Sequence, residues 1–141
     1  MERILVSACL LGVGCRYDCK DNGNEKILAL LQREDIQLIP VCPEQLGGLP
    51  TPRLPSERVG ERVINSSGQD VTAQFENGAA ETLKLAKRCG CLRAILKARS
   101  PSCGYGQIYD GSFTGTLIEG NGVTAELLLR SGITVQAERG L

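Results

Sequence analysis

The chain has 141 residues, and its 42% hydrophobic and 23% charged residues are typical of a globular protein rather than a disordered or fibrous one. Its 16 basic and 16 acidic residues cancel, so it lacks the net positive charge that draws proteins to nucleic acids and anionic membranes. It also has no histidine, which excludes Cys-His and Ser-His-Asp catalysis and mixed Cys/His zinc sites within this chain. We therefore expect a single domain over residues 1–141, with no membrane binding and no strong nucleic-acid binding.

In chain order, short apolar runs alternate with segments that have a helical apolar face. Prolines and glycines, which interrupt regular structure, separate them. The pattern predicts a strand at 3–9, a helix at 24–33, a strand at 36–41, an irregular loop at 43–55, a small β excursion at 61–70, a helix at 70–88, a strand at 91–97, a loop or hairpin at 106–120, a helix at 123–130 and a strand at 133–136. This alternation predicts an α/β fold with a single-domain, three-layer, Rossmann-like parallel sheet and helices on both faces.

The seven cysteines indicate the redox state that the chain is adapted to. Their number is odd and their density lies below that of a disulfide-stabilised scaffold. Only five residues separate Arg3 from Cys9, too few for the apolar part of a signal peptide. We therefore expect reduced thiols and a cytoplasmic location.

Three of these cysteines, Cys9, Cys42 and Cys103, lie at or just after the ends of predicted strands. The carboxyl ends of parallel strands meet at one edge of a sheet, where open α/β folds bind their ligands. Each cysteine taken alone would more often be a buried packing residue. The shared position of all three favours a common site.

Two kinds of metal centre use cysteine thiolates as ligands. A structural zinc site needs four protein ligands and usually uses C-x-x-C pairs, which are absent here. An iron–sulfur cluster held by three cysteines would leave one iron free for a small ligand. The alternative to an enzyme is a non-catalytic protein in which zinc or a closed cluster serves structure or binding.

Polar residues next to the cysteines are candidates for the chemistry. Glu44 lies two residues after Cys42, and Ser100 and Ser102 lie within three residues of Cys103. Without histidine, a carboxylate is the natural proton carrier. Glu44 could equally be a solvated loop carboxylate, and Ser100 could be only a turn former.

Three separated motifs resemble the thiouracil desulfidase-like family, a small bacterial domain formerly of unknown function. The resemblance covers nearly the whole chain, and the motifs occur in the order of the family. They are residues 7–12 with 16–18, residues 41–44 with 47–53, and residues 100–104.

The resemblance implies a [4Fe-4S] cluster bound by Cys9, Cys42 and Cys103, with its fourth iron taking the sulfur of the substrate. It implies Glu44 and Ser100 as the catalytic pair of a [4Fe-4S]-dependent thiopyrimidine desulfidase. The reaction would be a non-redox hydrolysis that releases sulfide from a thiolated pyrimidine base or nucleoside, with modified RNA also open. One departure is Cys19, where the family commonly has glycine, and it suggests a fourth thiol nearby.

Overall fold

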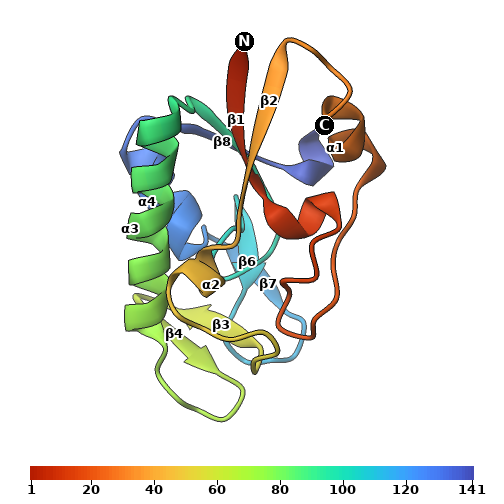
Figure 1. The fold of residues 1–141 in the computed structure, drawn as a ribbon. Helices are drawn as coiled ribbons and strands as arrows, with labels where there is room; N and C mark the ends of the chain where they lie inside the picture. The colour runs from red at the N-terminus through yellow and green to blue at the C-terminus, as the bar shows by residue number, and fades with distance from the viewer.

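The computed structural model describes residues 1–141. Its centre is a four-stranded, fully parallel sheet in the order β2-β1-β5-β8 (Figure 1). The strands are β1 (Glu2–Ser7), β2 (Ile36–Val41), β5 (Arg93–Leu96) and β8 (Thr134–Ala137). All four coincide with strands predicted from the sequence, although β1 ends two residues early and Cys9 falls on the following turn.

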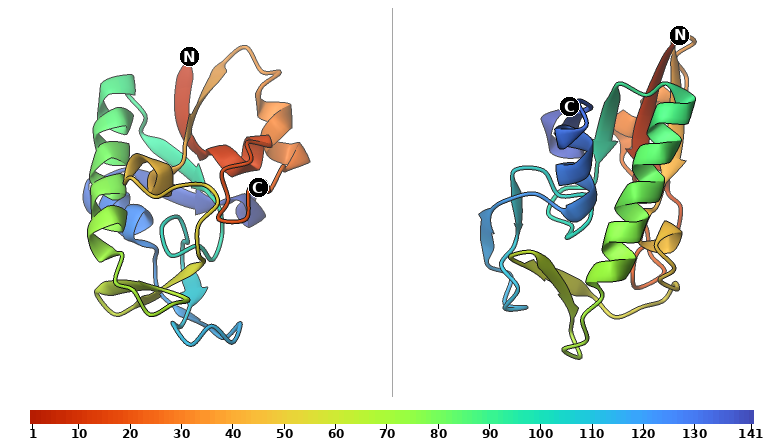
Figure 2. Two further views of the ribbon diagram at one scale, coloured as in Figure 1. Left: turned by 60° about the horizontal axis from the view of Figure 1, so that its bottom comes forward. Right: turned by 90° about the vertical axis from the view of Figure 1, so that its left-hand side faces the viewer.

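Helices cover both faces of this sheet (Figures 1 and 2). They are α1 (Glu25–Leu30), α2 (Pro43–Leu46), α3 (Thr72–Cys89) and α4 (Val123–Arg130), with 3₁₀ turns at Ala8–Leu11 and Glu138–Gly140. Because neighbouring strand residues point to opposite faces, Leu5 packs in the core under α3 and α4, whereas Ile4 and Val6 pack in the core that contains Ile27 of α1. The predicted three-layer α/β architecture is therefore confirmed. No helix combines the length and apolar character that a membrane crossing requires.

Two antiparallel hairpins lie beyond the carboxyl ends of the sheet, at the bottom of Figure 1. The first pairs β3 (Ser56–Val59) with β4 (Arg62–Asn65), and the second pairs β6 (Gln107–Tyr109) with β7 (Leu117–Glu119). The sequence predicted the β excursion that contains β4 but missed β3. For residues 106–120 the hairpin alternative is the correct one.

The prediction of an irregular loop over residues 43–55 was wrong at its start, because α2 forms one helical turn there. Proline is tolerated at the first helical position, where its missing N–H would have no partner in the helix anyway. The turn is held backbone to backbone against α3: a Cβ on Gly78 would lie 2.0 Å from the carbonyl oxygen of Pro43. Glycine at position 78 therefore lets α3 fix the place of α2, which carries Glu44.

Candidate active site

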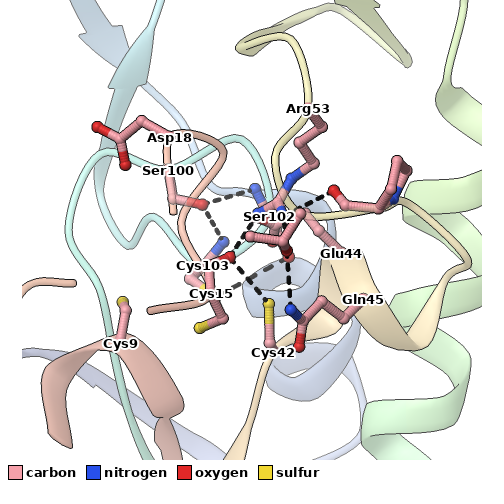
Figure 3. A network of polar contacts seen from close by, with 12 residues as sticks. Cys9, Cys15, Asp18, Cys42, Glu44, Gln45, Arg53, Ser100, Ser102 and Cys103 are labelled. Carbon is pink, nitrogen blue, oxygen red and sulfur yellow. Dashed lines mark hydrogen bonds and ion pairs between the residues drawn. The ribbon is translucent and has the colours of Figure 1, made fainter. Parts of the chain in front are cut away.

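A pocket of about 480 Å³ opens at the carboxyl ends of β1, β2 and β5. Five of the six residues singled out in the sequence line it, although they come from three separate parts of the chain (Figure 3). They are Cys9, Cys42, Glu44, Ser100 and Cys103. The parallel order of the strands brings these segments together, as the sequence argument required.

Each candidate ligand cysteine is placed by the element that follows a strand. Cys9 lies on the 3₁₀ turn after β1, and Cys42 is the residue that caps the amino end of α2 directly after β2. Cys103 lies in the loop after β5, with only 3% of its surface exposed. All three are free thiols.

Cys15 is a fourth thiol at this site, and no sequence pattern assigns it a role. It is 3% exposed and lines the pocket, and its carbonyl oxygen accepts a hydrogen bond from Sγ of Cys42 at 3.7 Å. The neighbouring Cys15 side chain lowers the pKa of Cys9 to about 7 and holds the pKa of Cys42 below its usual value, while the pKa of Cys15 itself is raised. Asn22 adds a contact from Nδ2 to Sγ of Cys9 at 3.5 Å. Two of the candidate ligands are thus held towards the thiolate, the form that binds metal.

Burial acts in the opposite direction on Cys103, because it raises the pKa of that thiol, and the negative charge of Glu44 raises it further. A thiol in such a place ionises when a metal binds it, since the positive charge of the metal stabilises the thiolate. The surroundings of Cys9 and Cys42 therefore favour the thiolate before metal binds, whereas Cys103 needs the charge of the metal in order to ionise.

The Glu44 carboxylate is paired with a residue that the sequence argument missed. Its Oε2 accepts a hydrogen bond from Nη2 of Arg53 at 2.9 Å, and the Glu44 and Arg53 side chains are only 17% and 8% exposed (Figure 3). The same Nη2 donates to the carbonyl oxygen of Cys15 at 3.0 Å. Arg53 thus pairs with the carboxylate and ties it to the loop that carries the fourth thiol. No protein donor contacts Oε1 of Glu44, which leaves this oxygen available.

The Ser100 hydroxyl is both a turn former and a pocket residue. Its Oγ accepts hydrogen bonds from the backbone N–H groups of Ser102 and Cys103, each at 3.0 Å (Figure 3). A serine hydroxyl has two acceptor lone pairs and one donor proton. Because both lone pairs are used, Ser100 presents its O–H to the pocket as a donor.

Two sequence expectations were wrong. Ser102 does not face the pocket: it is 1% exposed, and its hydroxyl bonds that of Thr124 at 3.0 Å. Cys19 is exposed and does not line the pocket, so the nearby fourth thiol is Cys15. The φ of +65° at Cys19 lies in the region that favours glycine, which explains why a glycine suits this position.

The donor set fits an iron–sulfur cluster. No group of three or more Cys, Asp or Glu side chains is arranged to hold a single metal ion. A cluster makes a different demand, because each cysteine binds its own iron and the thiols stand around the group. Thiolates are also the ligands that such clusters prefer. Cys9, Cys42 and Cys103, which line one pocket from three strand ends, meet this demand.

Comparison with known proteins also points to an iron–sulfur site. Residues 4–140 match the family model described as 2-thiouracil desulfurase. The uncharacterized protein YbbK of Bacillus subtilis (strain 168) is 43% identical over 98% of this chain and 97% of its own length. The solved structure of the [4Fe-4S]-dependent thiouracil desulfidase TudS (DUF523Vcz) is 48% identical and superposes with a TM-score of 0.94, over 100% of this chain and 93% of that one. The chain therefore belongs to the 2-thiouracil desulfurase family.

Proposed function

We propose that this chain is a [4Fe-4S]-dependent thiouracil desulfidase. It converts the thiocarbonyl of a thiolated pyrimidine base or nucleoside to a carbonyl and releases sulfide. The observation that carries the proposal is the convergence of three free thiols, a paired carboxylate and a donor hydroxyl in one pocket. The 48% identity to a thiouracil desulfidase over the full length of this chain supports it.

In this proposal Cys9, Cys42 and Cys103 hold the cluster. When bound, the cluster supplies an iron that no cysteine occupies, a Lewis acid with affinity for sulfur. Asn22 donates a hydrogen bond to Sγ of Cys9 and so orients this ligand, as groups behind metal ligands commonly do, and Cys15 lies beside Cys9 and Cys42 and favours their thiolates. Because this iron attracts sulfur, the thiocarbonyl sulfur of the substrate would point to the side of the pocket where the three cysteines lie.

Glu44 and Ser100 act on the carbon side of the thiocarbonyl. The free Oε1 of Glu44 accepts a proton from the attacking water, while Arg53 on Oε2 holds the carboxylate in place. The O–H of Ser100 donates a hydrogen bond that orients the substrate. Water supplies the new carbonyl oxygen and two protons, the carbon–sulfur bond breaks, and sulfide leaves with no net transfer of electrons.

Anaerobic loading of the protein with iron and sulfide tests this proposal. We expect about four irons and four acid-labile sulfides per chain, as in one cubane cluster, and release of sulfide from 2-thiouracil or a thiouridine. Glu44→Gln should keep the iron content but lose sulfide release by at least about a hundredfold, the low end for a positioned acid or base.

Two results would contradict the proposal in different ways. Stoichiometric zinc without acid-labile sulfide would exclude the cluster. A full cluster with no sulfide release from any thiopyrimidine would favour a binding or structural protein.

A further inference from the structure

Aromatic side chains are few in this chain, and they gather at the candidate active site. There are three tyrosines, two phenylalanines and no tryptophan. Four of these five line the pocket, namely Tyr17, Phe75, Tyr109 and Phe113, whereas Tyr105 does not. Planar heterocycles such as nucleobases stack, usually with an offset, on aromatic side chains, so such a pocket suits a planar heterocycle.

Among the four rings, that of Phe113 is the best placed to meet a substrate. Phe75 is only 3% exposed and belongs to a small core. The ring of Tyr17 already lies against the guanidinium of Arg16, whose Cζ is 5.7 Å from the ring centre. Tyr109 is half-buried within strand β6. Phe113, in contrast, is 39% exposed although it is large and wholly apolar.

The backbone holds Phe113 in an unusual conformation at the turn between β6 and β7. Its φ is +58°, a region that bulky residues rarely adopt, and strain of this kind is found at functional sites. Glu57, on β3 of the other hairpin, stabilises this turn: its Oε1 accepts the N–H groups of Gly111 at 3.0 Å and of Phe113 at 3.1 Å. Glu57 also lines the pocket, and the proposed mechanism does not use it.

We propose that Phe113 is the platform on which the pyrimidine ring of the substrate stacks, and that Glu57 is a positioning residue that holds this platform at the pocket. The inference rests on the proposed function and adds a specificity element to it. A phenyl ring has no hydrogen-bonding group, so it selects for a flat, unsaturated ring and not for the pattern of ring substituents. In a partly saturated thiocarbonyl compound such as 5,6-dihydro-2-thiouracil, carbons 5 and 6 have no π electrons. Stacking on Phe113 should therefore add less to its binding affinity.

The test compares cluster-loaded Phe113→Leu with the parent, using Tyr105→Leu as the matched control, because Tyr105 is 45% exposed and lies outside the pocket. The readouts are iron content, kcat and KM for sulfide release, and the Kd of uracil, which binds without turnover. Phe113→Leu should raise KM and the uracil Kd about fivefold, or about 1 kcal/mol, because leucine keeps apolar contact but not stacking. The preference of Phe113→Leu for 2-thiouracil over the dihydro compound should also fall about fivefold, while kcat for 2-thiouracil and the iron content are retained. Phe113→Tyr should restore binding, and Tyr105→Leu should match the parent.

Glu57 is tested through its coupling to Phe113. Glu57→Ala should weaken uracil binding in the same way, and Glu57→Gln should do so less, because its amide oxygen still accepts a hydrogen bond. The double variant Glu57→Ala/Phe113→Leu should bind no more weakly than Phe113→Leu, since one residue acts through the other.

Each contrary result would overturn a different part of the inference. Unchanged uracil binding and substrate preference in Phe113→Leu, with a parent that releases sulfide, would overturn the platform and leave the proposed function standing. Additive losses would overturn the positioning role of Glu57. A fully loaded parent that releases no sulfide would overturn the proposed function, and this inference with it.

Discussion

Replacing Arg53 with methionine tests whether the ion pair at the candidate site also stabilises the fold. The guanidinium donates to Glu44 at 2.9 Å, to the carbonyl oxygen of Cys15 at 3.0 Å and to the Thr51 hydroxyl at 3.0 Å. Because this side chain is only 8% exposed, little water reaches the groups that it contacts. Methionine keeps an unbranched apolar chain in the same space but leaves the carboxylate without its partner.

The expected cost follows from this burial. Removal of one partner of a buried ion pair costs about 3–5 kcal/mol, because a charge is left unpaired away from water. The Glu44 side chain is 17% exposed, so some hydration remains, and we expect about 2–3 kcal/mol. The Arg62–Asp70 pair is the matched control, with side chains 73% and 38% exposed. Arg62→Met should cost less than about 1 kcal/mol, as is usual for pairs in water.

The assay is urea denaturation of cluster-free protein, which gives the free energy of unfolding without contributions from cluster loss. A double-mutant cycle then isolates the pair. Arg53→Met should cost at least about 1 kcal/mol less in the Glu44→Gln background, because no charge is then left unpaired. The reasoning fails if Arg53→Met costs no more than Arg62→Met, or if the two changes at the site are additive.

Three further predictions use other residues. Cys42→Ser should lose the cluster, whereas Cys89→Ser, at the opposite end of the sheet from the pocket, should keep it; equal iron contents would show that the ligands were wrongly chosen. Ser100→Ala should retain iron and lower kcat by about tenfold, less than Glu44→Gln, because only an orienting hydrogen bond is lost; an unchanged kcat would reduce Ser100 to a turn former. Hydrogen bonds from Thr72 lower the pKa of Asp70 to about 2, so its stabilising charge is present above about pH 4 and is lost as the pH falls towards 2. Asp70→Asn should remove that part of the acid dependence of unfolding, and an identical pH profile in the variant would count against it.

The predictable parts of the fold are the elements whose apolar residues recur with a regular helical or strand spacing. The long apolar face of α3 and the short apolar run of β2 each specify their element without reference to the rest of the chain. In contrast, α2 is a single turn within a proline-rich segment, and it is held by the backbone contact of Pro43 with Gly78, 35 positions away. Such a contact leaves no periodic signal in the sequence.

The same distinction applies to the candidate site. The convergence of the cysteines was predictable because parallel strands bring their carboxyl ends together whatever the loops do. Arg53 was not, because its pairing with Glu44 depends on the path of the loop after α2. The choice between Cys15 and Cys19 as the fourth thiol also depends on loop geometry, since both follow the same strand, and the positive φ of Cys19 goes with its exposed position outside the pocket.

The electrostatics of the pocket explain why a carboxylate there needs an arginine. With no histidine in the chain, the proposed proton acceptor is a carboxylate, and it stands among thiols that bind iron as anions. The negative charge of Glu44 raises the pKa of Cys9, Cys42 and Cys103 alike, so an uncompensated carboxylate would oppose ligand formation. Arg53 answers both needs, because it pairs with the carboxylate and its charge lowers the pKa of Cys42. The residue that pairs with the proposed base thus also favours the thiolate of Cys42, which is why we expect its loss to affect stability and sulfide release together.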